Sequence, residues 1–216
     1  MKILVTAGST RVMIDQVRCI TNIFHGKTGH AIANCFADKG HKVTLLSNAT
    51  YGIEPYVLSY QFKTYDELYR MMEEELAVPR YDVVIHSAAV SDYYVEGTYN
   101  AALEKLDSSE KICSDHEELY LKLTPTPKII DQIRDVWGFK GTLVKFKLQV
   151  GMSDEELIGI AEASRIHSKA DLIVANCLEW CRERAIIIGE DGLVLETTRE
   201  ALPRMLYQII VGDPTC

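Results

Sequence analysis

Long hydrophobic runs, an excess of basic residues and a framework of paired cysteines are all missing from this sequence of 216 residues. No apolar run approaches the roughly 18 residues that a membrane-spanning helix needs. The N-terminus carries no signal-peptide pattern, because Met1 and Lys2 lead directly into a strand-like run. The net charge of −8 argues against a protein that coats nucleic acid. We therefore expect a cytoplasmic protein that binds neither membranes nor nucleic acid.

The cysteines predict free thiols in a reducing compartment, because their spacing follows no disulfide framework. They are Cys19, Cys35, Cys113, Cys177, Cys181 and Cys216. The pair Cys177 and Cys181 has no second pair or nearby histidine, so inert thiols are favoured there over a metal site. The length suits a single domain over residues 1–216, large enough for a full core.

Two glycine-bearing turns near the N-terminus predict a site for an anion or nucleotide. The short β-branched run Lys2–Thr6 suits a buried parallel strand, and residues 7–10 form the turn after it. Residues 25–29 form a second turn before a helix whose apolar residues recur at helical spacing up to Gly40. The free amides at the start of that helix would then point at whatever occupies the turn.

The rest of the chain alternates strand and helix patterns. We expect further strands at 42–47, 58–62, 82–86, 143–148, 171–175 and 185–189. Helical faces recur around residues 68–76, 129–136 and 157–161, and a last helix is expected near residues 197–210. This order predicts an α/β fold of Rossmann-like, doubly wound type with a mostly parallel sheet.

Two segments break the alternation. Residues 91–118 show no helical period and are too long for an ordinary connection, which indicates a functional segment or an interface. Residues 124–127 contain two prolines that favour an extended approach to the next helix, with Pro127 in its first turn.

Motifs along nearly the whole chain resemble one enzyme family. Ala7, Gly8 and Thr10 are followed by residues 14–22 and by the Gly26–Gly29 turn, and further matching blocks occur in the same order. These blocks are 87–92, 110–112, 121–123, 127–130, 146–148 and 170–176. The sequence resembles the phosphopantothenate–cysteine ligase family of coenzyme A biosynthesis, in a stand-alone form with no room for a flavin domain.

The resemblance implies a two-step reaction. CTP would activate the carboxylate of 4'-phosphopantothenate as an acyl-cytidylate with release of pyrophosphate, and the amine of L-cysteine would then displace CMP. Mg²⁺ is expected with the triphosphate, no flavin is expected, and the family implies a homodimer in which residues 91–118 reach across the interface. An ATP-dependent version of the same ligase remains an alternative, because Phe146–Leu148 also resembles the ATP-using branch.

Two residues are expected to be catalytic. Lys111 matches the family's essential lysine, although Cys113 and Ser114 stand where two more lysines usually follow. Asn22 matches the asparagine that holds the acyl-nucleotide. From the residues alone, Lys111 is an exposed, solvated lysine, and Asn22 caps the helix that follows it.

The resemblance also assigns binding residues. Nucleotide binding is implied for Lys111 and for Gly8, Ser9, Thr10, Ala88, Ala89, Asp92, Phe146, Arg165 and Lys169. Asp92 is the candidate metal ligand, with a turn or helix cap as its alternative. Arg165 and Lys169 are expected on one face of a helix.

Substrate binding is implied for Arg18, Asn22, Gly26, Lys27, Gly29 and Asn176. Glycines at the second turn would permit close backbone approach to a phosphate. Arg18 has a surface salt bridge as its alternative role. Phe24 and His25 replace the family's usual small residues just before this turn.

Two other classes of protein stay open. The first strand and turn also suit an NAD(P)-binding oxidoreductase, although the Gly-x-Gly-x-x-Gly order is absent because Ser9 follows Gly8. A nucleotide or pantothenate sensor without catalysis would keep the fold after losing part of the lysine motif.

Overall fold

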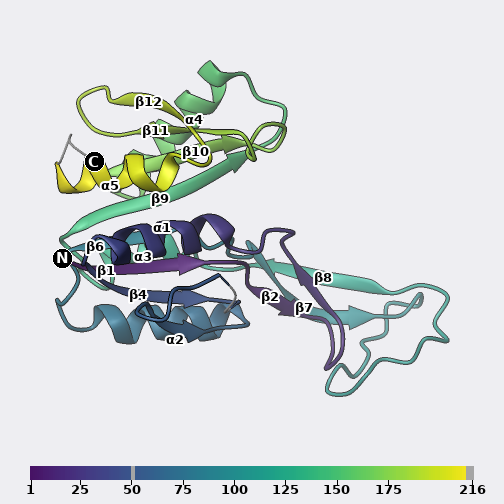
Figure 1. The fold of residues 1–216 in the computed structure, drawn as a ribbon. Helices are drawn as coiled ribbons and strands as arrows, with labels where there is room; N and C mark the ends of the chain where they lie inside the picture. The colour runs from purple at the N-terminus through teal and green to yellow at the C-terminus, as the bar shows by residue number, and fades with distance from the viewer. Residues whose placement is uncertain (50–51, 213–216) are drawn as a thin grey trace.

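The apolar runs of the sequence form the middle of one mixed sheet. The computed structural model describes residues 1–49 and 52–212, so Cys216 lies outside the described residues. The sheet has eight strands in the order β12-β11-β10-β9-β6-β1-β4-β5 (Figure 1). Their bounds are β1 Lys2–Ala7, β4 Lys42–Ser47, β5 Leu58–Gln61, β6 Val83–His86, β9 Thr142–Gln149, β10 Leu172–Cys177, β11 Arg184–Ile188 and β12 Val194–Thr198.

In the order across the sheet, the neighbouring strands from β10 through β9, β6, β1 and β4 to β5 pair in parallel. Strand β11 pairs antiparallel with β10, and β12 pairs antiparallel with β11, at one edge of the sheet. The predicted doubly wound, mostly parallel sheet is confirmed. Its parallel strands are nearly continuously apolar because helices cover both of their faces. In such a sheet the carboxyl ends of neighbouring strands meet at one edge, which is where ligands bind.

Helices divide between the two faces according to the alternation of strand residues. Ile3, Val5 and Ala7 pack under α1 (Lys27–Asp38), and the same cluster extends to α5 (Leu202–Val211). Leu4 points the other way, toward α2 (Tyr65–Leu76) and α3 (Ile129–Asp135). The helix α4 (Asp154–His167) covers β10 and β11 on that second face. Successive residues of each buried strand therefore point to opposite faces of the sheet and pack into two separate cores.

Several predicted boundaries are wrong. Thr197 belongs to β12 and the last helix starts at Leu202, after a turn that the helical pattern concealed. Pro127 precedes the N-cap Lys128 of α3 and so lies outside its first turn. Helix α4 ends at His167, and Lys169 adopts a left-handed φ of 53°, so Arg165 and Lys169 do not share a helix face.

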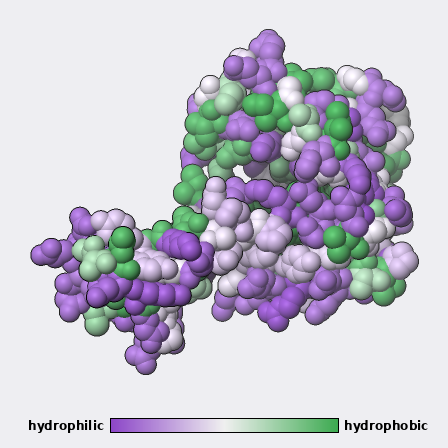
Figure 2. Space-filling view, turned by 180° about the vertical axis from the view of Figure 1, so that it is seen from behind, coloured by the Kyte–Doolittle hydropathy of each residue, from purple (hydrophilic) through white to green (hydrophobic). Residues whose placement is uncertain are grey.

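A two-part arm extends from the carboxyl edge of the sheet. One part is the hairpin of β2 (Arg11–Met13) and β3 (Cys19–Thr21), and the other pairs β7 (Tyr93–Tyr99) with β8 (Tyr120–Pro125). The predicted segment 91–118 therefore begins as a strand. Figure 1 shows the arm projecting beyond the sheet, and Figure 2 shows it as a lobe joined to the body by a narrow neck.

Within the described ranges 1–49 and 52–212, the structure bears on the expectations for membrane spans and for cysteines. None of the helices there is long and apolar enough to span a membrane. Within the same ranges, Cys19, Cys35, Cys113, Cys177 and Cys181 are free thiols.

A buried polar row crosses three central strands on the face of α4. The register aligns Thr6 of β1, His86 of β6 and Lys145 of β9. His86 Nδ1 lies 2.9 Å from the Thr6 hydroxyl, and the Lys145 ammonium donates to Ser164 and Ser168 of the α4 end. Burial lowers the pKa of His86 to about 4 and that of Lys145 to about 8. His86 is therefore neutral near pH 7.

Neutral burial of His86 predicts a loss of stability in mild acid. The unfolded histidine titrates near 6.5 and the folded one near 4, so between these values the unfolded state binds more protons. Lowering the pH through this window should remove up to roughly 3 kcal/mol of folding free energy through this residue. A His86→Gln variant should show an unfolding free energy, measured with urea, that depends less on pH between 6.5 and 4, whereas a His116→Gln variant at a partly exposed position should keep the wild-type dependence. An unchanged slope in His86→Gln would contradict the assignment.

Candidate functional site

The turn after β1 and the loop after β6 are joined at the carboxyl edge of the sheet. The Ala89 amide donates to the Gly8 carbonyl at 2.7 Å, and the Thr10 amide donates to the Ala89 carbonyl at 3.3 Å. Ser9 and Ala89 form an isolated parallel bridge. The structure thus brings together five residues of the predicted nucleotide set: Gly8, Ser9, Thr10, Ala88 and Ala89.

Asn22 lies beside these turns. Its Nδ2 donates to the Ala89 carbonyl at 3.2 Å, just after β3. The alternative role as a helix cap is wrong, because the N-cap of α1 is Gly26. An exposed amide held against the strand-end loop is free to exchange that hydrogen bond for one to a ligand.

The start of α1 approaches the sheet so closely that only glycine fits. A Cβ on Gly26, which has a φ of 79°, would lie 2.4 Å from the Gly8 nitrogen. A Cβ on Gly29 would lie 2.5 Å from the Ala7 Cβ and 2.6 Å from the Ser87 Oγ. Gly29 belongs to the first turn of α1 rather than to the loop before it.

This helix start differs from those of α2 and α4. Thr64 with Glu67, and Ser153 with Glu156, form complete capping boxes at the latter two. At α1 no side chain caps the helix and no acidic residue stands in the first turn. Its first amides and the positive end of its dipole therefore remain available to an anion.

Phe146 and Asn176 lie on the face of the sheet that carries α1. Phe146 is partly buried against the core under that helix. Asn176 alternates with Ala175 and Cys177, which pack toward α4, so its side chain points to the α1 face. Asn176 is 5% exposed, and its Oδ1 is buried without a hydrogen-bond partner among the described residues. A buried amide oxygen of this kind is costly unless a ligand or water pairs with it.

Asp92 sits at the base of the arm and is exposed. Its carboxylate is paired with the Lys128 ammonium, and its carbonyl accepts from the Thr126 amide at 2.9 Å. In the described part of the chain, no group of three or more His, Cys, Asp or Glu side chains could hold a metal ion. The residues present therefore fit Mg²⁺ only as an ion that arrives with a triphosphate, since Mg²⁺ commonly binds one carboxylate, phosphate oxygens and water.

Lys111 and Arg18 lie on the arm. The buried Asp15 carboxylate accepts from the Ile112 amide at 3.2 Å and from Arg18 Nε at 2.9 Å, and Arg18 Nη2 donates to the Ile112 carbonyl at 2.7 Å. The guanidinium holds the pKa of Asp15 well below its usual range. Arg18 thus makes the salt bridge that the sequence left open. These contacts fix the chain next to exposed Lys111 at the turn of the β2–β3 hairpin.

Arg165 and Lys169 are separated from the other predicted residues. Arg165 is buried, pairs with Glu162 and donates to the Ala170 carbonyl at 3.1 Å. Lys169 pairs with Asp135 and precedes β10 at the amino-terminal edge of the sheet. The Gly8 turn lies at the opposite edge, so we leave both residues out of the site.

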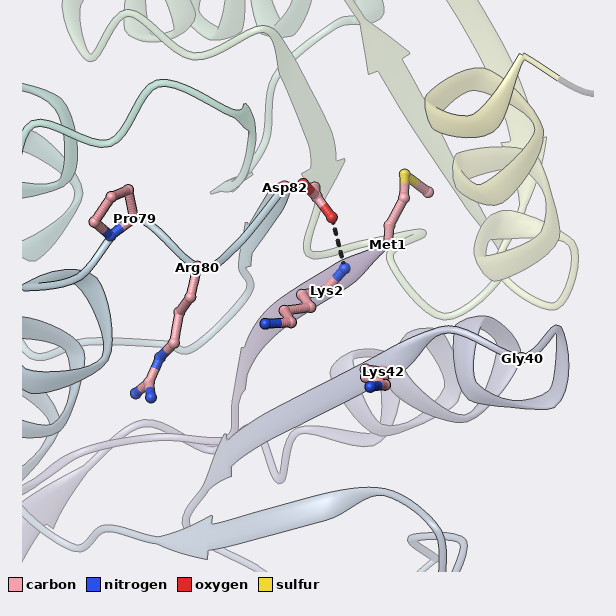
Figure 3. Close-up of a pocket in the computed structure, with 7 residues that line it drawn as sticks. All are labelled: Met1, Lys2, Gly40, Lys42, Pro79, Arg80 and Asp82. Carbon is pink, nitrogen blue, oxygen red and sulfur yellow. Dashed lines mark hydrogen bonds between the residues drawn. The ribbon is translucent and has the colours of Figure 1, made fainter.

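The same amino-terminal edge carries a shallow pocket of about 500 Å³. Figure 3 shows its lining, in which the Lys2 amide bonds the Asp82 carboxylate while the Arg80 side chain points away. None of the residues that line it belongs to the set predicted from the sequence.

Sequence reasoning missed two polar residues near the turns. Asn48 directly follows β4, and its Nδ2 donates to the Ser9 carbonyl at 2.9 Å. Its place after a buried strand was a usable signal, because ligand sites cluster there. Arg199 donates to the Thr28 hydroxyl at the start of α1. No sequence signal marks Arg199, because the two residues are 171 positions apart.

The glycine contacts predict opposite effects for two Gly→Ala variants in helices. Gly29→Ala forces a methyl group against Ala7 and Ser87, so it should lower stability and displace the start of α1. Gly159→Ala in α4 meets nothing within 4 Å and should raise stability by about 0.5–1 kcal/mol. Chemical denaturation measures both. Equal behaviour of the two variants would show that the close approach does not constrain the helix.

Comparisons with known proteins identify the family of this chain. Residues 1–202 match the family described as the DNA/pantothenate metabolism flavoprotein C-terminal domain. The coenzyme A biosynthesis bifunctional protein CoaBC of Thermococcus kodakarensis is 37% identical in an alignment of 216 positions that covers 96% of this chain and 50% of that protein. The chain thus spans about half the length of that curated relative.

Solved structures show the same fold. The crystal structure of the DNA/pantothenate metabolism flavoprotein from Streptococcus pneumoniae aligns with a TM-score of 0.87 and 32% identity, over 98% of this chain and 99% of that one. The C-terminal domain of a CoaBC protein aligns with a TM-score of 0.75 and 25% identity, over 98% of this chain and 94% of that one. The protein described here belongs to the family of DNA/pantothenate metabolism flavoprotein C-terminal domains.

Proposed function

We propose that this protein is a phosphopantothenate–cysteine ligase of coenzyme A biosynthesis. The observation that carries the proposal is the junction of three elements at the carboxyl edge: the β1 turn, the β6 loop with Asn22 bonded to Ala89, and the uncapped start of α1. Family membership and the coenzyme A role printed for the curated relative support it.

The chemistry explains why such a junction is needed. A carboxylate is a poor electrophile, so CTP first converts it to an acyl-cytidylate and pyrophosphate leaves. The cysteine amine then displaces CMP. Negative charge develops on phosphate and acyl oxygens in both steps, and fixed amides and cations stabilise it.

The two ligands divide among the residues at this edge. Gly8, Ser9, Thr10, Ala88 and Ala89 line the nucleotide site, and Phe146 borders the base. Gly26, Lys27, Gly29 and Asn176 receive phosphopantothenate, where glycine backbones allow a phosphate to approach the amides closely. Asn22 donates to the acyl oxygen of the intermediate. Mg²⁺ arrives with the triphosphate, with Asp92 as its protein ligand, and no flavin takes part.

The arm supports the proposal that two copies of the chain complete each site. Lys111 sits at the hairpin turn beside Asp15 and Arg18, beyond β2 and β3 and away from the Gly8 turn of its own chain. The arm also exposes large apolar side chains, among them Tyr94, Leu103 and Leu123. Figure 2 shows the arm as a protruding lobe, so apolar side chains exposed on it are accessible to a second copy of the chain. We therefore propose a homodimer in which residues 91–118 bring Lys111 to the partner's site, together with Arg18 of the β2–β3 hairpin, which is bonded to Ile112.

Pyrophosphate release tests the reaction. Purified protein with phosphopantothenate, CTP and Mg²⁺ should release pyrophosphate, and added L-cysteine should sustain turnover. Lys111→Ala should lower kcat by about 100-fold, the loss expected when one group that stabilises transition-state charge is removed. Lys105→Ala, on the same segment, should retain wild-type activity.

The outcomes separate the parts of the proposal. Absence of pyrophosphate with both CTP and ATP would reject the ligase in favour of a sensor. Turnover with ATP but not with CTP would show that ATP, rather than CTP, is the nucleotide substrate. Full activity of Lys111→Ala would reject only the role of Lys111.

Shared sites predict complementation between two inactive variants. Asn22→Ala and Lys111→Ala should each be nearly inactive. After the two proteins are mixed and exchange subunits, the mixed dimers contain one site with both residues intact. Activity should then recover to roughly a quarter of the wild-type value, because half of the dimers are mixed and each has one good site. Recovery of activity by a protein that sediments as a monomer would contradict shared sites. Failure of activity to recover although the subunits have exchanged would contradict them as well.

A further inference from the structure

Arg199 is a half-buried arginine whose partner is not an acid. Its guanidinium donates to the Thr28 hydroxyl, and its amide donates to the Glu183 carbonyl at 2.7 Å, which fixes its backbone beyond β12. The ion pairs of the described residues include Arg18, Arg80, Arg134, Arg165 and Arg184, each with a carboxylate, but not Arg199. Burial lowers the pKa of Arg199. Arginine nevertheless keeps its charge in proteins, so a poorly solvated cation remains.

The position of this cation adds to its cost. Thr28 is in the first turn of α1, where the helix dipole is positive. A cation at that end of a helix is unfavourable, and the acidic first turns of α2 and α4 show the usual arrangement in this chain. An anion between Arg199 and the helix start would reverse the sign of both effects.

The surrounding residues point to the same space. Arg199 follows Thr197 by two residues and so lies on the same face of the sheet as Thr197, which pairs with Ala185. Asn176 follows Ala175, the last residue of β10 in register with β11, and points to this face because Ala175 packs toward α4. The Arg199 side chain reaches from the end of β12 to the start of α1, at the same carboxyl edge at which β10 ends. The buried Asn176 oxygen, which has no partner among the described residues, therefore lies on the same face and at the same edge of the sheet as the contact between Arg199 and α1.

We propose that Arg199 binds a phosphate group at the start of α1, held between its guanidinium and the first amides of that helix. Two or more N–H donors of a guanidinium match the oxygens of a phosphate, and the helix amides supply the remaining donors. The proposal deepens the proposed function and rests on it for the source of the phosphate. That source is either the monoester of phosphopantothenate or the triphosphate of the nucleotide.

Inorganic anions test the site without any need for turnover. Titration of the wild-type protein with phosphate and with pyrophosphate, followed by calorimetry, should show binding that Arg199→Gln weakens by about tenfold or more. Arg199→Lys, which keeps the charge but loses the fork, should fall between the two. Arg182→Gln, an exposed arginine in the turn before β11, should bind as the wild type does.

Thermal unfolding in phosphate-free buffer separates binding from a structural role. Arg199→Gln should melt at or above the wild-type temperature, because it removes a poorly solvated cation. It should also lose the wild-type stabilisation by pyrophosphate. A lower melting temperature with unchanged anion affinity, or no binding of either anion by the wild type, would overturn the proposal.

Steady-state kinetics identify the source of the phosphate. A rise in KM confined to phosphopantothenate assigns Arg199 to the monoester, and a rise confined to the nucleotide assigns it to the triphosphate. An unchanged KM for both would overturn the role in an active ligase. If the wild type lacks ligase activity but binds pyrophosphate through Arg199, the proposed function fails and the phosphate site stands.

Discussion

The contact between the start of α1 and the ends of β1 and β6 is the constraint on which the site depends. Gly26 approaches the Gly8 backbone, and Gly29 approaches Ala7 and Ser87, at distances that exclude any side chain. The contact places the positive end of a helix directly over the strand ends. The same two strand ends carry the turn and the loop that bond to each other and to Asn22. One close packing contact thus sets the position of the amides, the turn and the asparagine together.

Much of the body could be predicted from the sequence, whereas the arm could not. Strands such as β4 and β6 are short, apolar and buried on both faces, so their composition alone marks them. Strands β3 and β8 are largely exposed and carry polar and apolar residues without a buried face. Their pairing comes from the partner strand rather than from a local pattern. The start of the last helix was predicted wrongly for a related reason, because Thr197 is compatible with both the helical and the strand pattern.

The site residues divide in the same way. The meeting of Gly8, Ala89 and Asn22 could be predicted because they lie at the ends of recognisable elements that the fold brings to one edge, and their roles stay predictions. Arg165 and Lys169 were misplaced because their spacing suggested one helix face, while the chain turns at Ser168 and leaves the helix. Arg199 was beyond prediction, since its meeting with Thr28 depends on the antiparallel addition of β11 and β12 to the sheet. A local sequence pattern shows where a residue lies on its own helix or strand. Contacts between distant elements, such as that of Arg199 with Thr28, follow only from the topology of the sheet.

Capping residues and acidic first turns are distributed unevenly among the helices of this chain. Helices α2 and α4 begin with complete capping boxes and acidic first turns, although the start of α2 also pairs with Arg11 just after the β1 turn. Helix α1 begins without either feature and has a cation beside it. Asn176, on the same face, has a buried oxygen without a partner. Each of these arrangements costs folding free energy in the absence of a ligand, and each becomes favourable when an anion with a hydrogen-bond donor occupies the space. The body of the fold supplies the stability that allows the start of α1 and Asn176 to remain without partners until a ligand binds.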